Sequence, residues 1–250
     1  MNKRSSTHTQ FEQKSLVRLL VLHLLPAIIW LIFYIPLARF ASEKGIPTMF
    51  VMYILVALVL VPFEIGFLYY QGKKMNGKFS LKGVVLYREK MPWWQYLLFG
   101  LISFAWIVVI MVNGTQISNF LQTNLFSWIP DWFYLSRGSV EQNAPSIETS
   151  MWILGLLFLA IIGPLAEELY FRGYLLPRLS KLRKWAPLVN VSLFILYHFW
   201  QPQALVTGII AMLPLVYIVW WKKNIYLSIG MHCFINTFGW VMDLLQRFGS

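Results

Sequence analysis

Long apolar runs, separated by short polar segments, make up most of this chain. A run of about 17 to 25 apolar residues is long enough to cross roughly 30 Å of hydrocarbon as a helix. The runs that reach or approach this length are 19–38, 49–70, 94–113, 150–176, 186–200, 203–221 and 225–246. The pattern therefore predicts an all-α fold, a polytopic transmembrane helical bundle of about seven spans, within a range of roughly six to eight.

The segments between the runs differ in charge. Lysine and arginine gather before the first run and after the second, fourth and sixth, namely at Lys3, Arg4, Lys14, Arg18, Lys73, Lys74, Lys78, Lys82, Arg88, Lys90, Arg178, Lys181, Arg183, Lys184, Lys222 and Lys223. By contrast, segment 114–149 has only Arg137 against Asp131, Glu141 and Glu148. Because Lys and Arg accumulate in cytoplasmic loops, we predict a cytoplasmic N-terminus and an external C-terminus.

Composition supports a membrane protein and narrows its partners. The chain is 58% hydrophobic and 12% charged, whereas soluble domains are near half apolar and a quarter charged. The net charge of +11 comes from the clusters above rather than from one basic face, so we expect contact with a lipid bilayer and no nucleic acid. The single cysteine, Cys233, excludes an intrachain disulfide. The aromatic-rich, amphipathic segment 118–135 predicts an extra helix at the membrane interface.

Three charged side chains interrupt the apolar run 150–176. On a helix, Glu168 and Arg172 are i, i+4 with the acid first, the favourable order for an ion pair. Glu167 is rotated by about 100° and cannot share that partner equally, so it remains as the unpaired carboxylate. The alternative is that all three charges form one packing network. The Gly-Pro pair at 163–164 predicts a new helix whose first turn holds both acids.

Two later runs each place polar side chains among apolar ones. The stretch LFILYHFW carries His198, and GMHCFINTF carries His232 and Asn236 at i, i+4, on one helix face. Such a pair can bind a developing oxyanion, or it can join helices by ordinary hydrogen bonds. A histidine near a helix end, such as His198, can equally be a packing residue. Other polar residues within the runs are His23, Glu64 and Asp243.

The depth of these polar residues favours a single site. From the nearest cytoplasmic-flank basic residues, Glu167, His198 and His232 are 11, 14 and 9 residues distant along the chain. Those flanking residues are Arg178, Lys184 and Lys223. At the helical rise, the three side chains lie roughly 16, 21 and 14 Å from the cytoplasmic side. We therefore expect one site in a water-filled cavity that opens to the cytoplasm.

The three polar motifs together resemble a known family. The stretch EELYFRG resembles the EExxxR motif of the CAAX-protease and bacteriocin-processing family of intramembrane proteases, which includes the type II CAAX prenyl endopeptidases and abortive-infection proteins. In the same order, FILYH and HCFIN resemble its FxxxH and HxxxN motifs. The resemblance covers residues 150–246, interpreted as the protease core, and leaves 1–149 as N-terminal transmembrane helices and loops.

The resemblance implies an intramembrane endopeptidase that hydrolyses a peptide bond of a membrane-associated protein or peptide. By position, Glu167 and His198 would hold and activate a water molecule. The oxyanion would be stabilised by His232 and Asn236, and the ion pair described above would support the site. Such chemistry needs a base and donors where negative charge develops. The implied location is a bacterial cell membrane, and the implied substrate is a lipid-modified C-terminus or, in a bacterial member, a peptide precursor.

A metal is the main open question about the predicted site. The family is often labelled metalloprotease, and Glu167, His198 and His232 supply a His2Glu set such as catalytic zinc accepts. The chain has no HExxH motif, however, and Asn236 has no obvious purpose as a ligand. We therefore expect that no cofactor is required, with zinc as the alternative.

Two other functions remain open at this stage. One is a membrane scaffold, such as a bacteriocin self-immunity protein, that uses the same fold without chemistry. The other is a proton-coupled transporter in which Glu64 and Asp243 extend a carboxylate–histidine relay. The sequence shows no internal repeat and no matched pair of broken helices, which are features typical of transporters.

Overall fold

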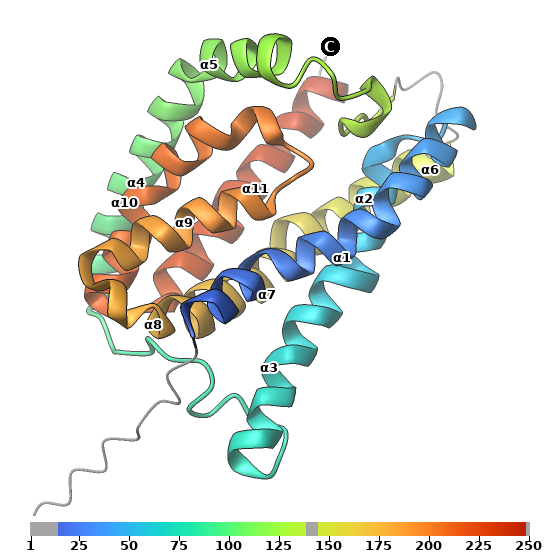
Figure 1. The fold of residues 1–250 in the computed structure, drawn as a ribbon. Helices are drawn as coiled ribbons and strands as arrows, with labels where there is room; N and C mark the ends of the chain where they lie inside the picture. The colour runs from blue at the N-terminus through green and yellow to red at the C-terminus, as the bar shows by residue number, and fades with distance from the viewer. Residues whose placement is uncertain (1–14, 139–144, 249–250) are drawn as a thin grey trace, which may run out of the picture.

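The chain folds into a helical bundle whose long helices run between two ends (Figure 1). The computed structural model describes residues 15–138 and 145–248. Within these residues no strand forms, which confirms the all-α prediction. The residues Lys3, Arg4, Lys14 and Glu141, used above to predict orientation, lie outside the described residues.

Several long helices contain both α-helical and π-helical turns. In chain order the elements are α1 (Leu16–Glu43), α2 (Thr48–Leu55), η1 (Val56–Leu60), α3 (Val61–Asn76), α4 (Trp93–Asn113), α5 (Thr115–Phe120), η2 (Leu121–Leu125), η3 (Asp131–Phe133), α6 (Pro145–Leu154), η4 (Gly155–Ile162), α7 (Gly163–Glu167), η5 (Glu168–Leu175), α8 (Leu176–Arg178), η6 (Ser180–Trp185), α9 (Ala186–Tyr197), η7 (Pro202–Ala204), α10 (Leu205–Lys222) and α11 (Ile225–Phe248). Of these, η1, η2, η4 and η5 are π-helical, and η3, η6 and η7 are 3₁₀.

Six helices among the described residues are long and apolar enough to cross a membrane. They are Leu16–Glu43, Thr48–Asn76, Trp93–Asn113, Pro145–Arg178, Pro202–Lys222 and Ile225–Phe248. This confirms a multi-pass membrane protein with a span number inside the predicted range. The predicted span 186–200 is the exception, because α9 has only 12 residues. At 1.5 Å per residue α9 covers about 18 Å, which is short of the hydrocarbon thickness.

The outer faces of the long helices are apolar, as a lipid environment requires. Ile32, Leu58 and Leu101 are 64%, 70% and 68% exposed. Contiguous exposed apolar surface of this kind is rare on soluble monomers. Inside the bundle, α1 packs against α2 and α9, and α10 packs against α9 and α4.

The helix Pro145–Arg178 continues through the Gly-Pro pair at 163–164. The predicted helix start at this pair is therefore wrong, and neither acid lies in the first turn of a new helix there. Proline has no N–H and normally breaks the i→i−4 pattern. Here the preceding turns are π-helical, and the N–H of Gly163 donates to Phe158, five residues back. The wider turn keeps the helix continuous.

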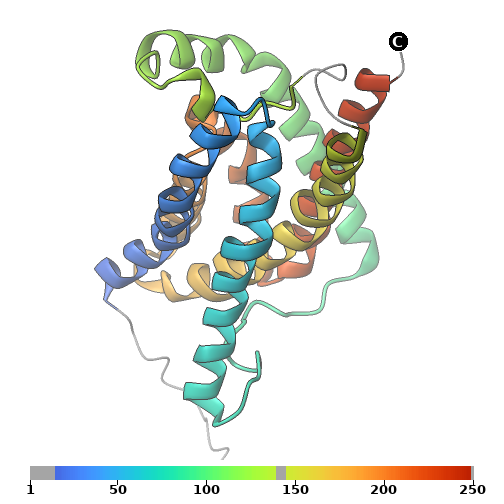
Figure 2. The same ribbon diagram turned by 90° about the vertical axis from the view of Figure 1, so that its right-hand side faces the viewer.

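One end of the bundle is covered by a helix that lies across it. α5 and η2 follow α4 after Gly114 and run at a steep angle to the bundle (Figures 1 and 2). Most of their side chains are exposed. The predicted interfacial helix at 118–135 is thus present as α5 with η2, followed by the short helix η3.

Candidate active site

The predicted ion pair between Glu168 and Arg172 is present. Nη1 of Arg172 lies 3.4 Å from Oε1 of Glu168, and both side chains are fully buried. The guanidinium also stacks on Phe194 of α9, with Cζ 3.8 Å from the ring centroid. Stacking and pairing together compensate part of the cost of burying a guanidinium. The stacking of Arg172 on Phe194 therefore joins η5 to α9.

Glu168 has a second partner that the sequence did not indicate. Nδ1 of His232 on α11 donates to Oε1 of Glu168 at 3.0 Å. One carboxylate oxygen thus faces both Arg172 and His232. Because the carboxylate holds Nδ1, it sets the orientation of the imidazole and leaves Nε2 for other contacts.

Glu167 faces the other side of the same histidine. Its Oε2 is 3.8 Å from Nε2 of His232, which is longer than a direct hydrogen bond. Its Oε1 accepts a hydrogen bond from the hydroxyl of Tyr197 at 3.3 Å. The side chain is 12% exposed, whereas that of Glu168 is not exposed at all. The two adjacent acids therefore have different surroundings, as the helical rotation predicted, but His232 contacts both.

Tyr197 is a member of the site that the sequence reasoning missed, and Glu64, noted there only as a polar residue within an apolar run, joins the site through it. The Tyr197 hydroxyl lies 3.1 Å from Oε1 of Glu64, and so links this carboxylate of α3 to Glu167. Both side chains are buried, and α3 packs against α7. Two signals were available: Tyr197 immediately precedes His198, and Glu64 is an acid inside an apolar run. Neither signal shows that the two residues meet.

His198 ends α9 and is held by its own helix. Its Nδ1 donates to the carbonyl of Phe194 at 2.8 Å. A carbonyl only accepts, so Nδ1 carries the proton and Nε2 is the nitrogen that can accept one. The ring packs among Phe194, Tyr197 and Trp200, with centroid distances of 4.7, 5.0 and 4.9 Å. His198 is thus a packed residue that still has an accepting nitrogen.

Asn236 is positioned by a π-helical turn. Its Nδ2 donates to the carbonyl of Leu159 in η4 at 2.8 Å. A primary amide has two N–H bonds, so one N–H remains for another acceptor. π-helical turns alter the regular backbone pairing and occur frequently at functional sites. Here such a turn offers a carbonyl that anchors the asparagine.

The four residues predicted to be catalytic line one cavity of about 210 Å³. This volume has room for several water molecules at roughly 30 Å³ each. The cavity is lined by Met49, Met52, Val56, Leu135, Phe158, Leu159, Gly163, Pro164, Glu167, His198, Trp200, Gln201, His232 and Asn236. The structure therefore brings Glu167, His198, His232 and Asn236 together from three separate helical segments.

In a comparison with family models, residues 149–238 match the family described as Type II CAAX prenyl endopeptidase Rce1-like. Residues 149–238 form an Rce1-like domain. The matched region contains all three motifs, and it leaves out Glu64. Comparison with curated proteins and with solved structures gave no match. A domain of this family implies a CAAX-type intramembrane protease, and hence a protein or peptide substrate.

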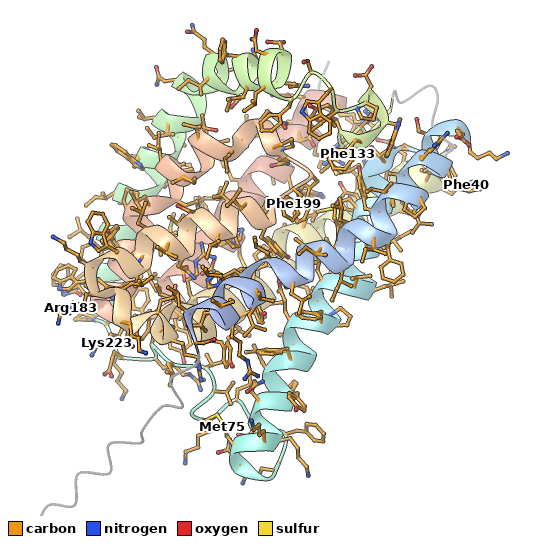
Figure 3. All side chains as sticks on the ribbon, in the orientation of Figure 1. Phe40, Met75, Phe133, Arg183, Phe199 and Lys223 are labelled. Carbon is orange, nitrogen blue, oxygen red and sulfur yellow. The ribbon has the colours of Figure 1, made fainter. Side chains whose placement is uncertain are left out.

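The lining of the cavity includes residues from three segments near one end of the bundle. These residues are Met49 in α2, Leu135 after η3 and Gln201 before η7, and the start of α2 and the two connecting segments lie toward the end covered by α5 (Figure 1). Arg183 and Lys223, which belong to two of the Lys/Arg clusters, lie at the other end (Figure 3). The opening of the cavity to the cytoplasm stays a prediction.

The donor groups of the Rce1-like domain are not arranged as a zinc site. Among residues 15–138 and 145–248, no group of three or more His, Cys, Asp or Glu side chains is spaced to hold a metal ion. Glu167, His198 and His232 all line the cavity, but both ring nitrogens of His232 face carboxylates. A metal-independent site stays a prediction, with zinc held by Glu167, His198 and His232 as the alternative.

The remaining polar candidates have structural partners. His23 donates from Nδ1 to Leu19 at 2.7 Å and accepts from Asn190 at 3.1 Å. Asp243 forms an ion pair with Arg137 at 2.6 Å. These contacts join helices or loops outside the cavity. Asp243 thus contacts Arg137, and no ion pair among the described residues joins it to the residues that line the cavity.

Proposed function

We propose that this chain is an intramembrane endopeptidase that uses a glutamate-activated water to hydrolyse a peptide bond of a membrane-associated protein or peptide. The observation that carries the proposal is the convergence of Glu167, His198, His232 and Asn236 on one cavity within the Rce1-like domain. A scaffold or self-immunity protein has no need for a base, an accepting histidine and two donors around a common space.

In the proposed reaction Glu167 is the general base. It removes a proton from a water molecule that donates its other proton to Nε2 of His198. The water oxygen forms a bond to the scissile carbonyl carbon, and the carbonyl oxygen takes up the negative charge. When the tetrahedral intermediate collapses, the C–N bond breaks and Glu167 returns its proton to the leaving amine. A base at hydrogen-bond distance contributes typically 10²–10⁴-fold to such a step.

Two donors are proposed to stabilise the oxyanion. The free N–H of Asn236 is one, because its other N–H is held by Leu159. Nε2 of His232, when it carries a proton, is the second. Glu168 holds the opposite nitrogen of that ring, and Arg172 holds Glu168. This series of contacts preorganises the donor, which is the main requirement for oxyanion stabilisation.

Tyr197 and Glu64 are proposed as positioning residues for the base. The Tyr197 hydroxyl contacts one oxygen of Glu167, which leaves the second oxygen on the side of His232. Glu64 in turn contacts the same hydroxyl. Two carboxylates linked by one hydroxyl in apolar surroundings favour a state in which one of them is protonated.

The test is comparison of membrane peptides from cells that carry the wild-type chain and cells that carry Glu167→Gln. Glu89→Gln, at an exposed position outside the cavity, is the matched control. We expect specific new peptide termini with the wild type and the control, and intact precursors with Glu167→Gln. Identical peptides in all three strains, at equal protein levels, would favour the scaffold or self-immunity function.

A further inference from the structure

The C-terminal end of α3 and the segment that follows it project beyond the other helices (Figures 1 and 2). The helix Thr48–Asn76 has 29 residues, so it is about 43 Å long, and at an average tilt of about 20° it still covers about 40 Å. The hydrocarbon of a bilayer is only about 30 Å thick. Residues 48–63 carry no charge, so the excess length is at the α3 end, where Met75 is labelled in Figure 3.

This projecting end is strongly basic. Segment 65–88 has five basic residues and no acid; the basic residues are Lys73, Lys74, Lys78, Lys82 and Arg88. All four lysines are exposed. Among the described residues, none of the four lysines forms an ion pair with a carboxylate. Their positive charges are therefore left for a partner outside the chain. We call residues 70–82 the basic projection.

The basic projection also exposes large apolar side chains. Tyr70, Met75 and Phe79 are 61%, 50% and 72% exposed. The ammonium nitrogen of Lys73 lies 5.6 Å from the ring centroid of Phe79. Aromatic side chains are enriched at the boundary between hydrocarbon and headgroups, and lysines there reach the headgroups with the charged end of a long apolar stem. A soluble polyanion would leave these apolar side chains in water, whereas a bilayer surface accommodates both kinds of side chain.

The backbone of the basic projection is fixed by local contacts. The segment after α3 folds directly back onto the helix, because a Cβ on Gly72 would overlap the carbonyl oxygen of Ser80. Gly77 ends α3 in the left-handed region with φ of +70°, which a glycine adopts without strain. The side-chain amide of Asn76 donates to the carbonyl of Lys82 at 2.9 Å. The lysines are thus held on one compact turn, and less ordering is needed when they bind a ligand.

The basic projection leads directly into a segment that is packed on η5. The N–H of Leu86 donates to the carbonyl of Gly173 at 2.8 Å. Nη1 of Arg178 donates to the carbonyl of Val84 at 3.2 Å. A ligand that holds the basic projection therefore also helps to keep this segment on the folded bundle. Such a ligand binds the folded state in preference to the unfolded chain.

We propose that the basic projection binds the headgroup of an anionic phospholipid of the surrounding bilayer. Clusters of lysine next to a membrane-spanning helix are attracted to anionic headgroups, and the attraction grows with each lysine. The phosphate oxygens accept hydrogen bonds from the ammonium groups, and the exposed aromatic side chains lie against the first part of the acyl chains. A neutral phospholipid offers the same phosphate without a net charge. This inference does not depend on the proposed protease activity.

The test is the melting temperature of the full-length purified protein in detergent micelles with added phosphatidylcholine or phosphatidylglycerol. A lipid that binds only the folded state raises this temperature. The test variant combines Lys73→Gln, Lys74→Gln and Lys78→Gln. The control removes three other exposed lysines, in Lys181→Gln, Lys184→Gln and Lys223→Gln. This control is matched in charge, and Lys184 also lies beside an aromatic ring, 5.7 Å from the centroid of Trp185.

Phosphatidylglycerol should raise the melting temperature of the wild type and the control by several degrees more than phosphatidylcholine does. In the test variant this difference should fall to less than half. Equal shifts with the two lipids in the wild type overturn the proposal, and this comparison does not depend on the folding of any variant. Equal losses in the test variant and the control also overturn it, because they indicate a general effect of net charge.

Two further conditions identify the source of the phosphate. In 1 M NaCl the screening length is about 3 Å, so the difference between the two lipids should disappear. A difference that persists in 1 M NaCl overturns the electrostatic contact. Soluble glycerol 3-phosphate, at the same phosphate concentration, should give no shift in the wild type. A shift as large as that with phosphatidylglycerol would indicate a site for a free phosphate compound and overturn the assignment to a lipid.

Discussion

At the scale of single residues, the adjacent acids Glu167 and Glu168 differ in what they contact. Glu168 is fully buried and faces Arg172 and His232, whereas Glu167 reaches the cavity and contacts Tyr197. A buried ion pair leaves an uncompensated charge when one partner is removed, and a base loses its function without losing its volume. Substitution of Glu167 should therefore affect mainly the cleavage rate, and substitution of Glu168 mainly the stability of the fold.

Glu167→Gln should lower the cleavage rate by roughly 10²-fold or more with little change in thermal stability, because shape and hydrogen bonding are kept. Glu168→Gln should destabilise the fold by about 3–5 kcal/mol, because it leaves the Arg172 guanidinium buried without its partner. Adding Arg172→Met to Glu168→Gln should recover part of that stability. The test is to measure the cleavage kinetics and the thermal melting of each purified variant. A fully active Glu167→Gln beside a well-folded, inactive Glu168→Gln would reverse the two roles.

Tyr197→Phe removes only the hydroxyl that links Glu64 to Glu167. The ring still packs against Phe171 and Trp200, at centroid distances of 4.9 and 5.6 Å. We expect kcat to fall about 10-fold and the pH profile of kcat to move, because the base loses its positioning contact.

The control for this variant is Tyr34→Phe. Tyr34 is also fully buried, and its hydroxyl donates to the carbonyl of Phe133 at 2.8 Å, away from the acids. It should lose about 1 kcal/mol of stability and keep the wild-type pH profile. If both variants give the same profile, Tyr197 has a purely structural role.

Chelation tests the site without changing any residue. The described donors are not spaced to hold a metal ion, and His232 contacts two carboxylates. Activity of the purified protein in detergent should therefore survive prolonged treatment with EDTA. Loss of activity that stoichiometric zinc restores would instead indicate that Glu167, His198 and His232 act as ligands.

At the scale of elements, Gly173 sets how closely segment 84–89 approaches η5. A side chain on this glycine would meet Val85 at 2.7 Å, and the carbonyl of Gly173 also accepts from Leu86. Gly173→Ala should therefore destabilise the protein by about 1–3 kcal/mol through overpacking.

Combining Gly173→Ala with Val85→Ala should recover much of that stability, because the second change removes the atoms that clash. Thermal melts of the two single variants and the double variant measure the coupling. Strictly additive effects would mean that the contact does not limit the approach of the segment.

At the scale of the whole molecule, substitution of Asp243 can distinguish a protease from a proton-coupled transporter. It pairs with Arg137 near the end of α11, and its side chain is 43% exposed. An exposed pair contributes about 0–1 kcal/mol. Asp243→Asn should therefore leave both the melting temperature and Glu167-dependent cleavage close to wild type. Loss of function in a stable Asp243→Asn protein, together with loss of proton flux in vesicles, would support the relay.

The membrane-spanning character of the chain, its helical class and the Glu168–Arg172 pair could be derived from sequence alone. Each depends on local properties: the transfer of apolar side chains into hydrocarbon, and the fixed spacing of a helix. The polar motifs also indicated Glu167, His198, His232 and Asn236 without any coordinates.

Only the tertiary structure decided how these residues meet. Glu64 and Tyr197 are 133 residues apart, and His232 lies 64 residues from Glu168, so no local period relates them. The extent of the cavity likewise depends on which side chains fill the space around the acids. Here Tyr170, Phe171 and Tyr174, which follow the acids along the helix, are buried in the core. Hydropathy cannot distinguish a filled end from an open one, because packing between helices, and not the transfer of each helix, determines where space remains.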